Sequence, residues 1–309
     1  METMRDIERR IDTVENTKKI TRAMKMVASA KLRRAQEKAE QARPFFNRTR
    51  DILIDIVHYT EETAEHPLLG STEGDKNLYL LVTSDRGLCG GYNTKVLRKF
   101  SASASPARTP TVVLGRSGYR KLEKEGYDIL ADYVDLDDYP SFYFARRITH
   151  RIIDLYLSED INQVNLIYTH FDSALSQTVK DIPLLPVVPP EEDSQDYQED
   201  LGVIEEEGET AETGVGEKSA RTTEANYLYE PSIPEVLDTI LPQYINNILY
   251  AAILESKASE FGSRMTAMDN ATENAEEMIE ELTLSYNRAR QEQITKEISE
   301  IVSGAEALK

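Results

Sequence analysis

The chain has 309 residues, of which 40% are apolar, which is enough for two domains of ordinary size. No run approaches the roughly 18 apolar residues of a membrane span, the start METMRDIERR has no apolar signal core, and one cysteine excludes an internal disulfide. A net charge of −19 argues against general nucleic-acid binding, and we expect a protein of a reducing compartment with no direct membrane insertion.

Residues 4–58 have the pattern of one long helix. Apolar or small side chains recur at intervals that mostly alternate between four and three residues, and Pro44 is expected to bend the helix rather than end it. Such a helix would be about 80 Å long, so it needs a partner along its length. The recurring positions are Ile7, Ile11, Val14, Thr21, Ala28, Leu32, Ala35, Ala39, Ala42 and Phe46.

Residues 18–34, which we call the collar, carry seven basic side chains and no acid. Because no acid falls inside the stretch, we expect no i,i+4 ion pair to relieve the repulsion. Met24 and Met26 lie among these charges, and flexible apolar side chains suit a surface that meets more than one partner geometry. An ordinary solvated helix face is the alternative, but the uncompensated charge favours a dedicated acidic partner.

Residues 76–190 change to an alternation of strands and helices. This pattern predicts an α/β layer domain with a largely parallel, Rossmann-like sheet. The acidic segment 191–230 follows with fourteen acids against Lys218 and Arg221, and its lack of apolar periodicity predicts a mobile loop. The expected strands are NLYLLVTS, TPTVVLGR, YDILADYV, VNLIYTHF and TVKDIPLLPVV.

Residues 231–309 are predicted to be helical again. Ser232 and Glu235 have the spacing of a capping box, and Pro242 is expected to kink the helix. A strict heptad seam of mostly small residues follows, which would let two helices approach closely. The seam positions are Met268, Ala271, Ala275, Met278, Leu282, Ser285 and Ala289.

The expected fold class is α/β, with a long antiparallel two-helix coiled coil formed by residues 1–60 and 231–309. The coiled coil would carry the central domain, residues 76–190, at one end. The alternative is that each long helix packs in a separate bundle. The tail ITKEISEIVSGAEALK places apolar residues at helical spacing, so it either packs on the first helix or outruns it and needs an external sheath.

The stretch TSDRGLCGGYN, residues 83–93, suggests either a phosphate cradle or a nucleophile. The lysine of a Walker loop and the dinucleotide fingerprint are both missing. Cys89 would need a nearby base, so a small buried thiol is expected instead. We expect no catalytic, cofactor or metal site in this chain. None of the four histidines is tied to Cys89 by the sequence or has metal-ligand spacing: His58, His66, His150 and His170.

Four stretches resemble the gamma subunit of the F-type ATP synthase, bacterial type. They are IERRIDTVENTKKITRAMKMVASAKLRRAQ, TSDRGLCGGYN, NYLYEP and YNRARQEQITKEISEIVSGA. The resemblance is strong over 1–95 and 226–305, looser over 96–190, and absent over 191–225. It implies a non-catalytic rotor shaft that transmits torque between the membrane proteolipid ring and the catalytic alpha/beta hexamer. It also implies a peripheral position on the cytoplasmic face of the bacterial cell membrane, with no cofactor.

The resemblance assigns rotor–stator contacts near the collar. Met24 resembles a residue that faces the acidic lever loop of beta, and Arg264 resembles a residue involved in coupling. The basic side chains that would attract the acidic loop are Lys18, Lys19, Arg22, Lys25 and Lys31.

Contacts are also implied at the two ends of the shaft. Arg290, Gln291 and Thr295 resemble polar contacts to the beta catch loop. Tyr227 and Glu230 fall where the family meets the proteolipid ring and the epsilon subunit. The glycines of DRGLCGG would shape a tight connection between a strand and a helix.

Two other classes of function remain open from the residues. One is a free-standing coiled-coil scaffold that carries an α/β module. The other is a nucleotide-binding enzyme that uses GLCGG.

Overall fold

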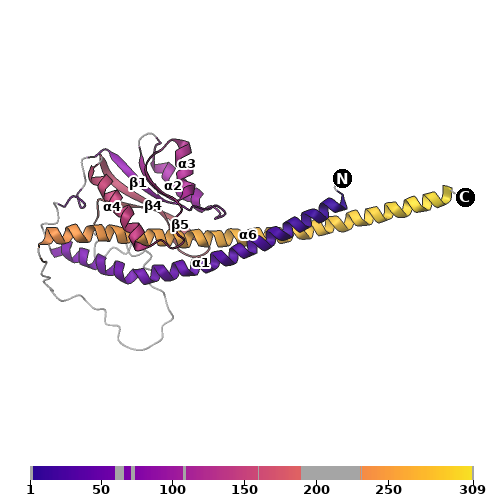
Figure 1. Ribbon diagram of the computed structural model, residues 1–309, viewed down its shortest axis with the longest axis horizontal. Coiled ribbons are helices and arrows are strands. Elements are labelled where there is room, and N and C mark those ends of the chain that lie inside the picture. The colour runs from indigo at the N-terminus through magenta and orange to yellow at the C-terminus, as the bar shows by residue number, and fades with distance from the viewer. Residues whose placement is uncertain are drawn as a thin grey trace, which may run out of the picture.

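The computed structural model describes residues 3–59, 66–70, 74–106, 109–158, 160–188, 230 and 232–307. Two helices, α1 (Met4–Tyr59) and α6 (Ile233–Ala307), lie side by side in opposite directions (Figure 1). Both run without interruption through the prolines at 44 and 242. The antiparallel pairing of the two terminal segments is therefore present, and the alternative of two separate bundles is wrong.

A single five-stranded sheet has the order β3-β2-β1-β4-β5. Its first four strands are parallel to their neighbours, and β5 is antiparallel to β4. The prediction of a largely parallel sheet is confirmed, and each predicted strand is present. The elements are β1 (Lys76–Val82), α2 (Tyr92–Ser103), β2 (Pro110–Leu114), α3 (Arg116–Glu125), β3 (Asp128–Tyr133), α4 (Phe142–Ser158), β4 (Ile161–Phe171) and β5 (Gln177–Leu185).

Both faces of the sheet are covered, which explains why its strands have continuous apolar runs. In β1, Leu78 and Leu80 belong to a core shared with α4, α6 and the end of α1, whereas Tyr79 and Leu81 face α2 and α3. Each fully buried aliphatic side chain of this kind stabilises the fold by about 1.5–3 kcal/mol.

The first part of α6 has two roles. Leu241, Ile245 and Leu249 are fully or almost fully buried in the core that includes the sheet. Further along, Ala258 and Phe261 pack against Leu32 and Ala35 of α1. One helix therefore belongs both to the globular part and to the shaft, so the two parts share a rigid element.

The seam between the long helices differs from the predicted one. Met268 and Ala275 are buried as expected, but Met278 is 45% exposed and Ser285 is also exposed. Ile279 and Tyr286, each one residue further along, are half-buried in place of Met278 and Ser285. The hydroxyls of Thr21 and Thr272 form a hydrogen bond of 2.8 Å, so a face one residue further along α6 than predicted lies toward α1 here. The heptad repeat is kept with a shifted second position.

The carboxyl-terminal part of α6 extends beyond the start of α1 (Figure 1). Every described side chain from Arg290 to Ala305 is exposed. At 1.5 Å per residue, this overhang, residues 290–307, is about 27 Å long. The reading in which the tail packs on the first helix is therefore wrong. Its apolar residues are Ile294, Ile298, Ile301 and Val302, which are 44%, 56%, 71% and 53% exposed.

Among the helices in the described ranges, none is both long enough and apolar enough to cross a membrane.

Gly115 is required by the close approach of the turn after β2 to the end of β1. Its φ is +95°, and a Cβ there would collide with the carbonyl oxygen of Thr83. We expect Gly115→Ala to reduce the free energy of unfolding by at least about 3 kcal/mol, since backbone strain and a steric clash add. Gly126→Ala is the control: φ is +76°, but nothing lies within 4 Å. It should reduce stability by only about 1 kcal/mol in the same denaturant titration, and equal losses would contradict the steric argument.

Candidate functional site

A groove of about 400 Å³ opens where α1, α6 and the loop after β1 meet. We call it the neck groove. Three of the predicted contact residues, Met24, Lys31 and Arg264, line it together. Arg86 and Leu88 of the glycine-rich loop form another wall. The structure thus joins residues from three distant parts of the chain into one surface.

Helix α6 holds the glycine-rich loop by its carbonyl groups. The Ser263 hydroxyl donates to the carbonyl of Cys89 at 2.9 Å, and Arg264 donates to the carbonyls of Arg86 and Gly87 at 3.2 and 3.3 Å. Gly90 has φ +56°, and a Cβ there would lie 3.5 Å from the Ser263 hydroxyl. The prediction that these glycines shape a tight connection is supported by this geometry.

Cys89 is buried, at 3% exposure, and accepts a hydrogen bond from the Asn93 amide at 3.4 Å. The prediction of a small buried thiol is confirmed. Leu88, by contrast, is 64% exposed and has φ +61°, an unusual conformation for a residue with a side chain. The loop therefore places one apolar side chain at the surface and one thiol in the interior.

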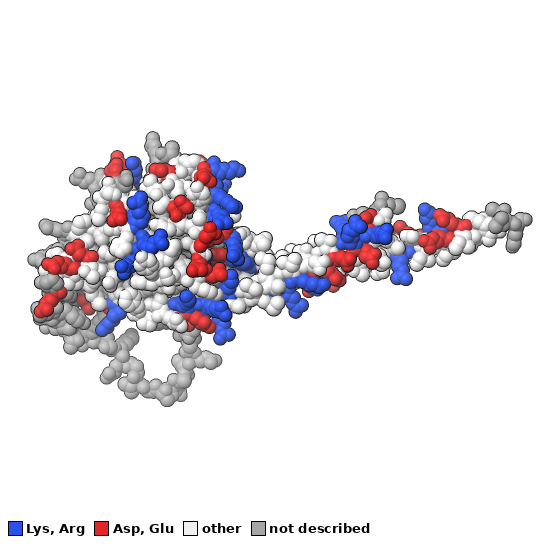
Figure 2. Space-filling view, in the orientation of Figure 1, with Lys and Arg blue, Asp and Glu red and all other residues white. Residues whose placement is uncertain are grey.

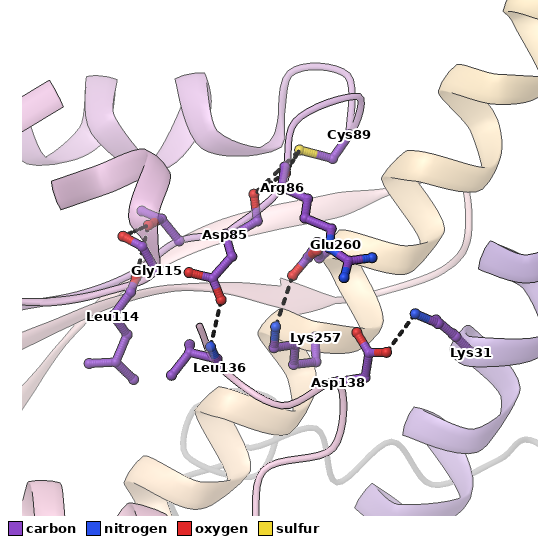
Figure 3. Close-up of polar contacts among 12 residues, drawn as sticks. Lys31, Asp85, Arg86, Cys89, Leu114, Gly115, Leu136, Asp138, Lys257 and Glu260 are labelled. Atoms are coloured by element: carbon purple, nitrogen blue, oxygen red, sulfur yellow. Dashed lines mark hydrogen bonds and ion pairs between the residues drawn. The ribbon is translucent and has the colours of Figure 1, made fainter. Parts of the chain in front are cut away.

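Asp85 places a carboxylate at the start of α3. It accepts hydrogen bonds from the backbone N–H groups of Arg116, Asp135 and Leu136, at 2.9, 3.0 and 2.7 Å. Figure 3 shows the bond to Leu136. A helix N-terminus in this kind of sheet is where phosphate groups often bind. Here the chain supplies its own anion.

The crevice at which a doubly wound sheet binds nucleotides lies where the strand order reverses, here between β1 and β4. Helix α6 fills it with serines spaced along one face. Ser256 accepts from the Thr169 N–H and Ser259 donates to the Thr169 carbonyl, both at 3.2 Å, and Ser263 bonds the loop after β1. The nucleotide-binding alternative therefore has no open crevice at this point.

A buried ion cluster lies on α6 beside the neck groove. Glu260 contacts Lys257 at 3.3 Å and Arg264 at 2.8 Å, and all three side chains are at most 11% exposed. Figure 3 shows the contact between Lys257 and Glu260. Burial, and secondarily the charge of Glu260, raises the pKa of Tyr92 far above its ordinary value. Because the carboxylate is paired on both sides, its loss would leave two buried cations without compensation.

The collar is partly neutralised by the chain itself. Lys18 pairs with Glu276 of α6 at 2.9 Å, Lys25 pairs with Asp269, and Lys31 pairs with Asp138 at 2.5 Å. At its ends, acids one turn outside the stretch add i,i+4 pairs: Glu15 with Lys19 at 3.9 Å and Glu37 with Arg33 at 3.3 Å.

The expectation that the collar's repulsion is unrelieved is therefore wrong, because acids of distant segments and acids just outside the stretch pair with its basic residues. Figure 2 shows acidic and basic side chains close together along the shaft. Arg22 is exposed, and Met26 and Val27 beside it are 61% and 56% exposed. An outward surface of mixed apolar and basic character remains.

The other predicted contact residues lie away from the neck groove. Arg290, Gln291 and Thr295 are exposed on the overhang, where the Thr295 hydroxyl donates to the Gln291 carbonyl at 2.9 Å. Glu230 is exposed just before α6 begins, and Tyr227 lies outside the described residues. The acidic segment from 191 to 229 also lies outside them.

Two of the described histidines are paired with carboxylates. His170 is buried against Glu255 at 2.7 Å, and His66 contacts Asp238 at 3.0 Å. Within the described ranges, no group of three or more His, Cys, Asp or Glu side chains could hold a metal ion.

Sequence reasoning missed Arg86, Leu88, Asp138 and Glu260 as parts of the groove. A leucine between glycines was a usable signal, since an apolar residue at the tip of a tight turn is exposed. Asp138 and Glu260 carried no such signal, because their position depends on how three segments meet.

Comparison with known proteins identifies relatives along the whole chain. The family model described as ATP synthase matches residues 3–308. The ATP synthase gamma chain of Halothermothrix orenii is 50% identical over 310 residues, with 100% of both chains covered. That of Heliobacterium modesticaldum is 44% identical over 306 residues, with 99% of each covered.

Solved structures with a similar fold come from mitochondrial ATP synthases. A chain of the Tetrahymena thermophila central stalk and c-ring structure has 27% identity and a TM-score of 0.58, with 82% of this chain and 99% of that chain covered. A chain of the Euglena gracilis OSCP/F1/c-ring structure has 19% identity and a TM-score of 0.63, with 99% and 94% covered. The second likeness is one of fold alone.

The Asp85 carboxylate should matter for stability. We expect Asp85→Asn to lower the free energy of unfolding by about 1–3 kcal/mol, because an amide cannot accept three hydrogen bonds from N–H groups as a carboxylate does. Asp137→Asn, at an exposed position in a neighbouring loop, should change it by less than about 0.5 kcal/mol. Equal effects in urea titrations of the two variants would show that Asp85 does not organise these loops.

Proposed function

This chain belongs to the family of ATP synthase gamma chains, and from that premise we propose that α1 and α6 act together as the central rotor shaft of a bacterial F-type ATP synthase. The shaft transmits torque between the membrane proteolipid ring and the catalytic alpha/beta hexamer. Ion flow then drives ATP synthesis, and hydrolysis drives the reverse. The chain is a non-catalytic subunit, and the chemistry takes place on its partners.

The overhang of α6 is the observation that carries this function. An exposed apolar stripe on a single projecting helix is unfavourable in water unless another protein encloses it. A ring of subunits around the shaft would provide that enclosure. A free-standing scaffold would leave the stripe in solvent, so the structure favours the rotor over the scaffold.

The asymmetry of the shaft supports a coupling mechanism. One chain inside a three-fold ring cannot make three equivalent contacts at once. Each orientation therefore stabilises a different set of conformations in the surrounding catalytic sites, which is coupling by differential contact.

We place the main rotor–stator contacts at the neck groove and the collar. Met24 lines a groove in which three basic residues outnumber the acids Asp138 and Glu260, which suits an acidic lever loop with an apolar tip. The basic residues are Lys31, Arg86 and Arg264. Exposed Arg22, together with Lys18, Lys19 and Lys25, would extend this basic surface along α1.

A second set of contacts lies on the overhang. Arg290, Gln291 and Thr295 would meet the catch loop of beta, which is consistent with their exposure on a part of α6 that has no helix beside it. At the other end, Tyr227 and Glu230 would meet the proteolipid ring and the epsilon subunit. The complex would then sit on the cytoplasmic face of the bacterial membrane.

We also propose a division of the chain by role. Residues 1–60 and 231–309 would form a left-handed coiled coil, 76–190 the α/β domain, and 191–230 an acidic loop. The repeating contact of α6 with α1 is consistent with supercoiling.

Charge reversal separates the two roles of the collar. We expect Lys18→Glu with Lys25→Glu to weaken both shaft stability, by about 1–2 kcal/mol for two half-exposed pairs, and ion-coupled ATP synthesis. Adding Glu276→Lys and Asp269→Lys restores the pairs in reverse. Stability should then return to the wild-type value while synthesis in reconstituted vesicles stays low, since a collar with two reversed charges attracts an acidic loop less strongly. Full recovery of synthesis would mean that the collar acts only within the shaft.

The overhang can be tested without disturbing the fold. Ile298→Ser with Ile301→Ser should leave the free energy of unfolding of the isolated chain within about 0.5 kcal/mol of wild type, because both residues are already exposed. ATP-driven proton pumping by the reconstituted complex should fall several-fold. Glu300→Ser, on the exposed polar face, is the matched control and should pump normally. Normal pumping by the double variant would argue against an enclosing ring.

A further inference from the structure

A second cavity lies between α1 and α6, on the globular side of the shaft and away from the neck groove. Arg43, Phe46 and Arg50 of α1 face Tyr244, Asn247 and Ile248 of α6 across it. Residues 43 and 50 are two turns apart, so both arginines lie on the same side of α1.

The cavity contains buried polar atoms that lack partners. Asn247 is only 2% exposed, yet among the described residues neither its side-chain nitrogen nor its oxygen has a hydrogen-bond partner. The buried Nε of Arg50 is in the same condition. Native proteins pair almost all such atoms with protein groups, water or a ligand. Each of the two helices thus contributes to the cavity lining a residue that has an unpaired buried polar atom.

The charge of the lining favours an anion. Its described residues include two guanidinium groups and no acid. Asp51 approaches the Arg50 guanidinium from outside the cavity, at 3.8 Å, so the pairing is weak. Guanidinium groups bind oxyanions through several N–H donors at once, and apolar walls such as Phe46 and Ile248 strengthen that attraction.

The size of the cavity also fits. The centres of water-sized atoms can occupy about 20 Å³ of it. The space therefore admits a ligand of only a few non-hydrogen atoms, the size class to which a tetrahedral oxyanion belongs.

We propose that this cavity binds one tetrahedral oxyanion of the phosphate or sulfate class. Arg43 and Arg50 would donate from α1 and the Asn247 amide from α6, so that the bound anion joins the two helices near the globular part. The Asn247 oxygen would be satisfied by a water molecule or a protonated phosphate oxygen.

The test is thermal unfolding of the full-length chain in sodium phosphate and in sodium chloride at equal ionic strength. At a phosphate concentration ten times Kd, the wild-type Tm should rise by about 3 °C. Arg48→Met is the matched control, because this exposed arginine of the same helix does not line the cavity, and it should keep the full rise. Arg50→Met and Asn247→Leu should each lose it. In chloride, Asn247→Leu should be at least as stable as wild type, since it removes an unpaired buried amide.

Phosphorus-31 line widths provide a readout that does not depend on stability. Wild type and Arg48→Met should broaden the phosphate signal, and Arg50→Met should not. An equal rise in Tm for all four proteins would indicate general exclusion of phosphate from protein surfaces and would overturn the proposal. So would the absence of any rise or broadening in wild type. An equal response to acetate would overturn the tetrahedral assignment and indicate a carboxylate site instead.

Discussion

The close packing of α1 against α6 is the interaction on which the rest of the structure depends. Alanines at 28, 35, 258 and 275 are buried in this interface, and small side chains let helix backbones approach to the near end of about 8–10 Å. Little apolar area is buried per turn, and half-exposed ion pairs add only about 0–1 kcal/mol each. The stability of the shaft therefore comes from many weak contacts repeated over a great length.

Helix α6 connects this shaft rigidly to the sheet. Its first turns belong to the main core, its serines bond the ends of β4 and the loop after β1, and the buried Glu260 cluster lies where the shaft leaves the globular part. A rotation of the sheet must therefore turn α6 with it. The same contacts fill the crevice in which related sheets bind nucleotides, so rigidity and the lack of such a crevice have one cause.

The fold could largely be predicted from periodicity. Short apolar runs in the strands and a spacing of three and four in the long helices depend on local geometry, which the sequence carries directly. The second seam position could not, because the hydrogen bond between Thr21 and Thr272 depends on the register of two segments far apart in the chain. The pairing of collar lysines with Glu276 and Asp269 was missed for the same reason.

The candidate site was predictable only in part. Met24, Lys31 and Arg264 were identified by resemblance, and the structure brings them into one groove. Leu88 and Asp138 complete it from loops whose position is a result of tertiary packing. The unpaired amide of Asn247 had no signal at all, because an asparagine inside a helical run has the same pattern whether its partners are present or missing.

The projecting end of α6 has a mechanical consequence. Over about 27 Å the overhang is a single helix that is supported only at one end, whereas the rest of the shaft has two helices. Two bonded helices resist bending far better than one, so a sideways load at the tip is absorbed as flexure there. The tip therefore stays on the rotation axis only if the subunits around it hold it there. The straightness of α6 at that end is then set by those subunits and not by the shaft itself.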